Sequence, residues 1–152
     1  MRCLLDTGIL LRMVDIRDAL HASVVDGVNL LAGQRTELFT ATQNVAEFWN
    51  VATRLLSDNG LALETSAVLF GVEHIIQRTC GVLKEPESMF ETFKYLGRKY
   101  QFRGKQVHDA RLVALMLCAG VNHILTLNDR DFRRYEPEGI VVHTPASLTA
   151  GA

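Results

Sequence analysis

The stretch Met1-Arg-Cys-Leu-Leu-Asp6-Thr7-Gly8 opens the chain and contains the pattern on which the fold prediction rests. Residues 2–5 predict a short buried strand, and Asp6-Thr7-Gly8 predicts its end. A carboxylate next to core-forming residues is costly unless it is paired, capped or bound to a cation. The end of this first strand is therefore both a structural boundary and a candidate functional position.

Outward from this stretch, short apolar runs alternate with segments of helical period. We expect further strands at 37–41, 81–84, 121–126 and 139–143. We expect helices at 9–14, at 17–33 with Gly33 as C-cap, from a cap at Thr40 or Thr42 to about Ser57, and at 64–79, 87–101 and 107–119. The alternation predicts a parallel sheet in an α/β fold, with ligand sites beyond the carboxyl ends of the strands.

Composition indicates a soluble globular chain of one domain. The 152 residues are 48% hydrophobic and 22% charged, with a net charge of −1 and a pI near 6.5. This balance does not indicate nucleic-acid binding, although a local basic patch can outweigh the sum. The three cysteines form no Cys-x-x-Cys pair, the N-terminus lacks a signal-peptide pattern, and the longest apolar stretch, 112–120, is too short for a membrane span. We therefore expect a cytoplasmic protein that does not enter the membrane.

Acidic residues follow several of the predicted strands. Asp6 ends the first strand, Glu47 lies early in the helix after the second, and Asp109 lies at the start of the apolar helix 107–119. A fourth acidic segment, Thr126-Leu-Asn-Asp-Arg-Asp131, follows the fourth strand. All four can face one edge of the sheet, where carboxylate oxygens would suit Mg²⁺ or Mn²⁺.

Each acidic position also has a purely structural interpretation. Asp6 could cap the next helix, and Glu47 could lie on a solvated polar stripe with Asn44, Asn50 and Arg54. Asp109 could be the N-cap of its helix, and His108 could cap or pack rather than act on a proton.

The fourth acidic segment could be a turn rich in Asn and Asp. The triplet Asp6-Thr7-Gly8 also occurs in aspartic proteases, but those are all-β proteins and this chain has mostly helical patterns. No second Asp follows Asp6 two residues later, which argues against a haloacid-dehalogenase phosphotransfer loop.

Four motifs in order resemble the PIN-domain ribonucleases, in particular the VapC-like toxins of bacterial type II toxin–antitoxin pairs. The resemblance covers about residues 1–146 and leaves 147–152 as a C-terminal tail. It is based on the motifs Leu4-Leu-Asp6-Thr-Gly-Ile-Leu10, Asn44-Val-Ala-Glu47-Phe48, Gly104-Lys-Gln-Val-His-Asp109-Ala-Arg-Leu-Val-Ala114 and Ile124-Leu-Thr126-Leu-Asn128-Asp-Arg-Asp131-Phe132, with Val142-His-Thr-Pro145 resembling the closing strand. The family implies a three-layer α/β/α sandwich with a mainly parallel sheet.

The resemblance also implies metal-dependent RNA cleavage by a homodimer that a cognate antitoxin blocks. Asp6, Glu47, Asp109 and Asp131 are then the expected catalytic residues, with Asp6, Asp109 and Glu47 as ligands of Mg²⁺ or Mn²⁺. Whether Asn128, Asp129 or Asp131 fills the fourth position stays open. Expected contacts to RNA come from Asn128 and the cluster of Arg130, Arg133 and Arg134.

The segment 94–105 combines cations with aromatic residues, which suits either contact with unpaired RNA or an ordinary exposed helix. Two other functions remain open. One is a non-catalytic PIN-like module that only binds RNA or protein, and the other is a phosphatase or a DNA-directed nuclease with a similar acidic site.

Overall fold

A computed structural model describes residues 1–150 and contains a five-stranded sheet in the order β3-β2-β1-β4-β5. Every neighbouring pair of strands is parallel. The strands are β1 Arg2–Leu5, β2 Glu37–Ala41, β3 Gly81–Leu83, β4 His123–Leu125 and β5 Val141–His143. All five predicted strands are confirmed, and β1 lies at the centre with Leu4 opposite Phe39 of β2 and Ile124 of β4.

One face of the sheet is covered by helices from the first half of the chain and by the last helix. Cys3 and Leu5 of β1 face this layer and pack with buried apolar residues of its helices. The elements are α1 Thr7–Val14, α2 His21–Gly33, α3 Thr42–Thr53, the 3₁₀ turn η1 Leu56–Asp58, α4 Thr65–Gly71, the π-helical segment η2 Val72–Ile76, α5 Gln77–Thr79 and α9 Pro145–Thr149.

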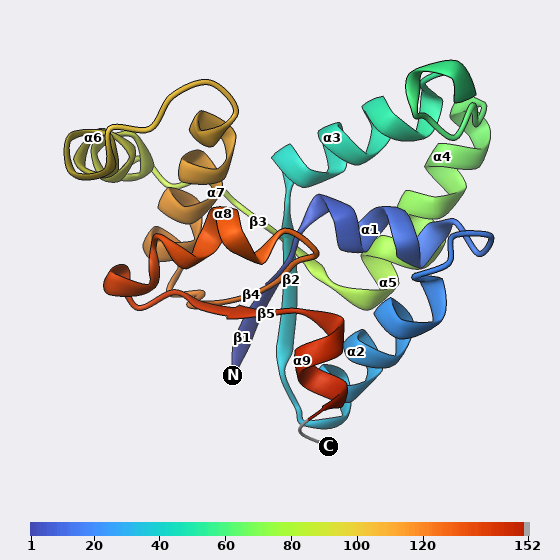
Figure 1. Cartoon of the computed structure of the whole chain (residues 1–152), viewed down its shortest axis with the longest axis horizontal. Helices are drawn as coiled ribbons and strands as arrows, with labels where there is room; N and C mark the ends of the chain where they lie inside the picture. Colours follow the sequence, from blue (N-terminus) through green and yellow to red (C-terminus); the bar gives the residue numbers. More distant parts are fainter. Residues whose placement is uncertain (151–152) are drawn as a thin grey trace.

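The opposite face is covered by α6 Met89–Tyr100, α7 Gln106–Ala119 and α8 Asp129–Arg133, with the 3₁₀ turn η3 Glu136–Glu138 before β5. Leu4 faces this second core, in which α7 contributes a run of buried residues from Leu112 to Met116. Side chains alternate across a strand, so β1 supplies both cores. Figure 1 shows the two helical layers on either side of the strands, which confirms the predicted α/β/α sandwich.

The helix after β2 differs from its prediction at both ends. Neither Thr40 nor Thr42 caps it, because Ala41 is the N-cap and makes no side-chain bond. Thr40 is buried in β2, where its hydroxyl donates to the Leu5 carbonyl at 3.1 Å. The helix stops at Thr53 instead of near Ser57, and Leu55 and Leu56 beyond its end are 63% and 70% exposed.

Both ends of α2 and the segment after β4 also differ from the prediction. The helix predicted from residue 17 begins at His21, and its C-cap is Gln34 rather than Gly33. The segment after β4 contains the short helix α8, where the sequence indicated only a turn.

The predicted tail begins inside α9, which is stabilised by a capping box between Thr144 and Ser147. Leu148 of the same helix packs against the first core, so residues 147–149 are part of the packed structure. Residues 151–152 lie outside the described residues. Within residues 1–150, no helix is long and apolar enough to cross a membrane.

Candidate acidic site

The expected acidic residues lie at the carboxyl edge of the parallel sheet. Asp6 directly follows β1, Glu47 is in the second turn of α3 after β2, Asp109 is in the first turn of α7, and Asp131 is in α8 after β4. In a parallel sheet all strands end at the same edge, so the order of elements alone brings these segments together. The charges of neighbouring acids contribute to the raised pKa values of Asp6 and Asp109, which agrees with this proximity.

Asp6 is the most constrained of the four acids. Its Oδ1 accepts from the Thr7 backbone amide at 2.7 Å and from Asn44 Nδ2 at 3.3 Å, and its Oδ2 accepts from the Thr126 hydroxyl at 2.7 Å. Burial nevertheless raises the pKa of Asp6, and the charges of Glu47 and Asp131 raise it further, against the lowering effect of the bonds from Thr126 and Thr7. A bound cation would favour the ionised form.

Glu47 is held between α1 and its own helix. Thr7 Oγ1 donates to Glu47 Oε2 at 2.7 Å, and Gln43 Nε2 donates to Glu47 Oε1 at 3.1 Å. Asn44 Nδ2 also donates to Thr7 Oγ1 at 3.0 Å. Asn44 is fully buried, so a solvated polar stripe does not describe this part of α3.

Asp109 is not the N-cap of α7, because the helix begins at Gln106 and its N-cap is Lys105. Burial raises the pKa of Asp109 to about 6, and the charges of Asp131, Asp6 and Glu47 add to this. His108 lowers the Asp109 pKa slightly and is itself exposed. The structural alternative of a helix cap therefore fails for Asp109, whereas for Asp6 it is correct, since Asp6 caps α1.

Asn128, Asp129 and Asp131 are the candidates for the fourth position of the acidic site, and their contacts differ. Asp129 forms an ion pair with Arg133 at 2.8 Å, whereas Asn128 Nδ2 donates to Asp131. The charge of Asp131 acts on both Asp6 and Asp109. The Thr126 hydroxyl both donates to Asp6 and accepts from the Asn128 backbone amide at 3.0 Å.

The predicted arginine cluster is divided by its contacts. Arg133 pairs with Asp129, and Arg134 donates to the Tyr100 carbonyl at 2.8 Å and lies over the Tyr135 ring at 5.5 Å. Arg130 is exposed and forms no ion pair with the described residues. The structure thus joins Arg133 and Arg134 to neighbouring side chains and leaves Arg130 open to solvent.

The donor set suits a hard divalent cation by its chemistry, since carboxylate oxygens are the ligands that Mg²⁺ and Mn²⁺ prefer. Within residues 1–150, no three acidic, His or Cys side chains lie close enough together to form a ready ion site. The buried Asn44 Oδ1 beside Asp6 and Thr7 also has no hydrogen-bond partner among the described residues. The pKa values of Asp6 and Asp109 are raised mainly by burial, and the charges of the neighbouring acids add to this.

Two residues of this network were not anticipated from the sequence. The sequence predicts Thr7 only as part of a turn, and none of the motifs includes Gln43. The signal for Thr7 was its position directly after Asp6, where the hydroxyl can reach the same sheet edge. The signal for Gln43 was its position one helical turn before Glu47, since residues i and i+4 share a helix face.

Solved structures with this fold belong to VapBC and FitAB proteins, and the predicted PIN-like architecture is confirmed. VapBC2 from Rickettsia felis, bound to a DNA fragment from its promoter, has a TM-score of 0.69 at 13% identity, covering 95% of this chain and 98% of that one. VapC20 from Mycobacterium tuberculosis, described as a Sarcin-Ricin loop cleaving toxin, has a TM-score of 0.64 at 15% identity over 91% and 96% of the two chains.

FitAcB from Neisseria gonorrhoeae has a TM-score of 0.61 at 15% identity, over 95% of this chain and 98% of that chain. At these identities the similarity establishes the fold. No family model and no curated protein matches the sequence.

Proposed function

We propose that this chain is an endoribonuclease that depends on Mg²⁺ or Mn²⁺ and acts as the toxin of a toxin–antitoxin pair. The observation that carries the proposal is the placement of four acidic residues from four separate segments at one edge of the sheet, where burial and, to a lesser extent, the neighbouring carboxylates raise the pKa of Asp6 and of Asp109. The similarity to VapC20, described as a Sarcin-Ricin loop cleaving toxin, supports RNA as the substrate.

Asp6, Asp109 and Glu47 would hold the cation, and Asp131 would be the fourth carboxylate of the site. When bound, the cation supplies positive charge that offsets these carboxylates and the negative charge of the phosphodiester. Thr7, Asn44 and Thr126 keep the Asp6 carboxylate in one orientation through their hydrogen bonds. Glu47, held by Thr7 and Gln43, would complete the metal shell or orient the attacking water.

The RNA backbone would be contacted from the β4–α8 side of the site. Arg130 is the first candidate because it has no ion-pair partner among the described residues, and Asn128 lies beside Asp131. Arg133 and Arg134 would have to leave their present contacts to reach a phosphate.

A cognate antitoxin, a homodimeric assembly and a cytoplasmic location belong to the same proposal. The VapBC and FitAB structures of this fold support a protein partner, since FitAB and VapBC2 were solved on DNA fragments as two-component assemblies.

The test is RNA cleavage by the purified chain. Single-stranded or loop RNA should be cut with Mg²⁺ or Mn²⁺ and left intact with EDTA. Asp6→Asn and Asp109→Asn should each lower the rate by orders of magnitude, because each removes a charge that attracts the cation. His108→Ala is the matched control, and since its side chain is exposed it should change the rate only slightly.

Expression in a bacterial host extends the test to the biological role. Wild type should arrest growth, and both Asn variants should not, at matched soluble expression. Equal toxicity of the variants would contradict the nuclease proposal and favour a non-catalytic module that binds RNA or protein.

A further inference from the structure

Gln43 lies in the first turn of α3, one turn before Glu47, and uses both ends of its amide. Its Nε2 donates to Glu47 Oε1 at 3.1 Å and to the His108 carbonyl oxygen at 2.9 Å. Its Oε1 accepts from Arg111 Nη1 at 2.6 Å. One side chain therefore joins the Glu47 carboxylate to the backbone of α7 immediately before Asp109.

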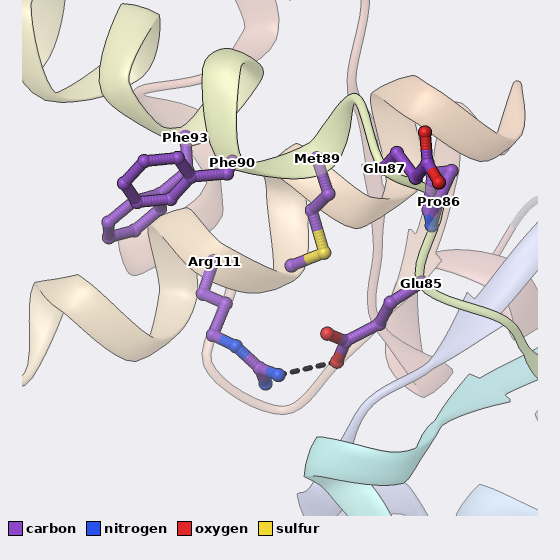
Figure 2. Close-up of a pocket in the computed structure, with 7 residues that line it drawn as sticks. All are labelled: Glu85, Pro86, Glu87, Met89, Phe90, Phe93 and Arg111. Atoms are coloured by element: carbon purple, nitrogen blue, oxygen red, sulfur yellow. Dashed lines mark hydrogen bonds and ion pairs between the residues drawn. The ribbon is translucent and has the colours of Figure 1, made fainter.

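Arg111 extends this chain of bonds away from the acids. Its Nη2 forms an ion pair with Glu85 in the segment between β3 and α6. Figure 2 shows the two side chains pointing toward each other beside a cavity of about 320 Å³, which Met89 and Phe93 also line. No ion pair joins Arg111 to Glu47 directly within residues 1–150, so the contact between them passes through Gln43.

We propose that Gln43 is a positioning residue for Glu47 and that Arg111 acts on Glu47 through Gln43. The inference rests on the proposed metal-dependent function. A direct Arg111–Glu47 ion pair would neutralise the carboxylate, whereas a neutral amide orients it and leaves its charge available to a cation. The hydrogen bond from the Arg111 guanidinium to Gln43 Oε1 polarises the Gln43 amide and strengthens its N–H donors.

The same amide sets the spacing of two elements. Because Gln43 bonds both Glu47 on α3 and the His108 carbonyl on α7, it connects the helices that carry Glu47 and Asp109. Without the Gln43 amide, Glu47 keeps only the hydrogen bond from Thr7 to its Oε2, and the Glu47 Oε1 atom is free to turn away. The expected result is a weaker cation site with an intact fold.

The first measurement is Mn²⁺ affinity of the RNA-free protein, from the electron paramagnetic resonance signal of free Mn²⁺. Gln43→Met keeps the length of the side chain and removes its hydrogen bonds, and Arg111→Met removes only the outer bond. We expect Gln43→Met to weaken Mn²⁺ binding about tenfold, the lower end for residues that orient metal ligands. Gln77→Met, at an exposed glutamine of α5, is the matched control and should bind as wild type.

Cleavage kinetics and a double variant separate positioning from general damage. At saturating metal, Gln43→Met should lower kcat with little change in KM, because Gln43 has no assigned contact with RNA. The double variant Gln43→Met/Arg111→Met should bind Mn²⁺ no more weakly than Gln43→Met alone, since Arg111 reaches Glu47 only through Gln43. Full additivity of the two losses would overturn the relay through Gln43.

If the Gln43→Met variant binds Mn²⁺ with wild-type affinity, Gln43 does not position Glu47. If Gln43→Met fails to fold, Arg111→Met alone decides, and wild-type Mn²⁺ binding in that variant overturns the inference. A wild-type chain that neither binds Mn²⁺ nor cleaves RNA contradicts the proposed function itself. A wild type that does both, with unchanged variants, contradicts only the role of Gln43.

Discussion

Asp6 shows that a structural and a functional interpretation of one residue need not compete. Its Oδ1 caps α1 through the Thr7 amide, while its Oδ2 accepts from Thr126 at the sheet edge. A carboxylate has several acceptor positions, so capping leaves part of Asp6 available to a cation. Asp109 has no capping role, and its pKa is raised first by burial and then by the acidic charges around it.

The raised pKa of Asp109 predicts a pH-dependent gain in stability for Asp109→Asn. In the folded protein this carboxyl titrates near pH 6, against an ordinary value of 3.8. The folded state binds the proton more tightly, so stability from this group is complete below about pH 3.8 and is lost as pH rises through about 6. In metal-free buffer Asp109→Asn should therefore melt above wild type at pH 7 and match it near pH 3.8.

Thermal unfolding of both proteins at several pH values measures this difference, and comparing the pair cancels the other titrating groups. Added Mn²⁺ should raise the melting temperature of wild type and leave Asp109→Asn nearly unchanged. An Asp109→Asn variant less stable than wild type at pH 7 without metal would show that the carboxylate is well compensated in the folded state.

At the scale of elements, the connection from β4 to α8 depends on one buried hydroxyl. Thr126 follows β4. Its hydroxyl donates to Asp6, which follows β1, and accepts a hydrogen bond from the backbone amide of Asn128, the N-cap of α8. A threonine at this place ties two neighbouring strand ends and one helix start together. Its loss affects both the geometry of Asp6 and the entry into α8.

Thr126→Val should destabilise the fold by about 1–3 kcal/mol, because it keeps the shape and removes the hydrogen bonds to the Asp6 carboxylate and from the Asn128 amide. For a chain of this size, that corresponds to a fall in melting temperature of roughly 2–4 °C per kcal/mol. Thr126→Ser, which keeps the hydroxyl, should recover most of the loss in differential scanning calorimetry. Equal melting of the Val and Ser variants would contradict a role for this hydroxyl.

For the whole molecule, the two cores are well filled, yet several large apolar side chains remain on the surface of both helical layers. Phe70 on α4 is 60% exposed and Phe90 on α6 is 65% exposed. In the predicted helix 64–79, Val68, Phe70, Val72 and Ile75 are the expected contributors to a homodimer contact, but Val68 is completely buried in the first core. Val72 and Ile75 are partly buried against the same core, so Phe70 is the member of this set that is exposed and available for a contact with a second copy.

We predict a homodimer in solution, with a mass from light scattering of twice the 16.9 kDa of the chain. Phe70→Glu should convert it to a monomer if the α4 face forms the contact, because burying a charge there is costly. Phe90→Glu, an equally exposed phenylalanine on the opposite layer, is the matched control. A wild-type mass of one chain at tens of micromolar would rule out the dimer.

The sequence alone determined the five strands, most of the helices, and the placement of acids after strand ends. These features depend on periodicity and turn residues within a few positions, which are read locally. It also identified Asp6, Glu47, Asp109 and Asp131 as a candidate set, because parallel strands end at one edge. The end of α3 at Thr53 and the short helices α8 and α9 were missed, since packing outweighs weak local signals there.

Only the tertiary structure determined which side chains hold the acids. Thr126 and Asp6 are 120 positions apart, and Thr7 and Glu47 are 40 apart, so no local pattern connects them. The same holds for the hydrogen bond between Gln43 and Arg111. Only the structure shows that Asp129 pairs with Arg133, whereas the charge of Asp131 affects Asp6 and Asp109. Hydrogen bonds and desolvation depend on distances of a few ångströms, which exist only once both helical layers have packed onto the sheet.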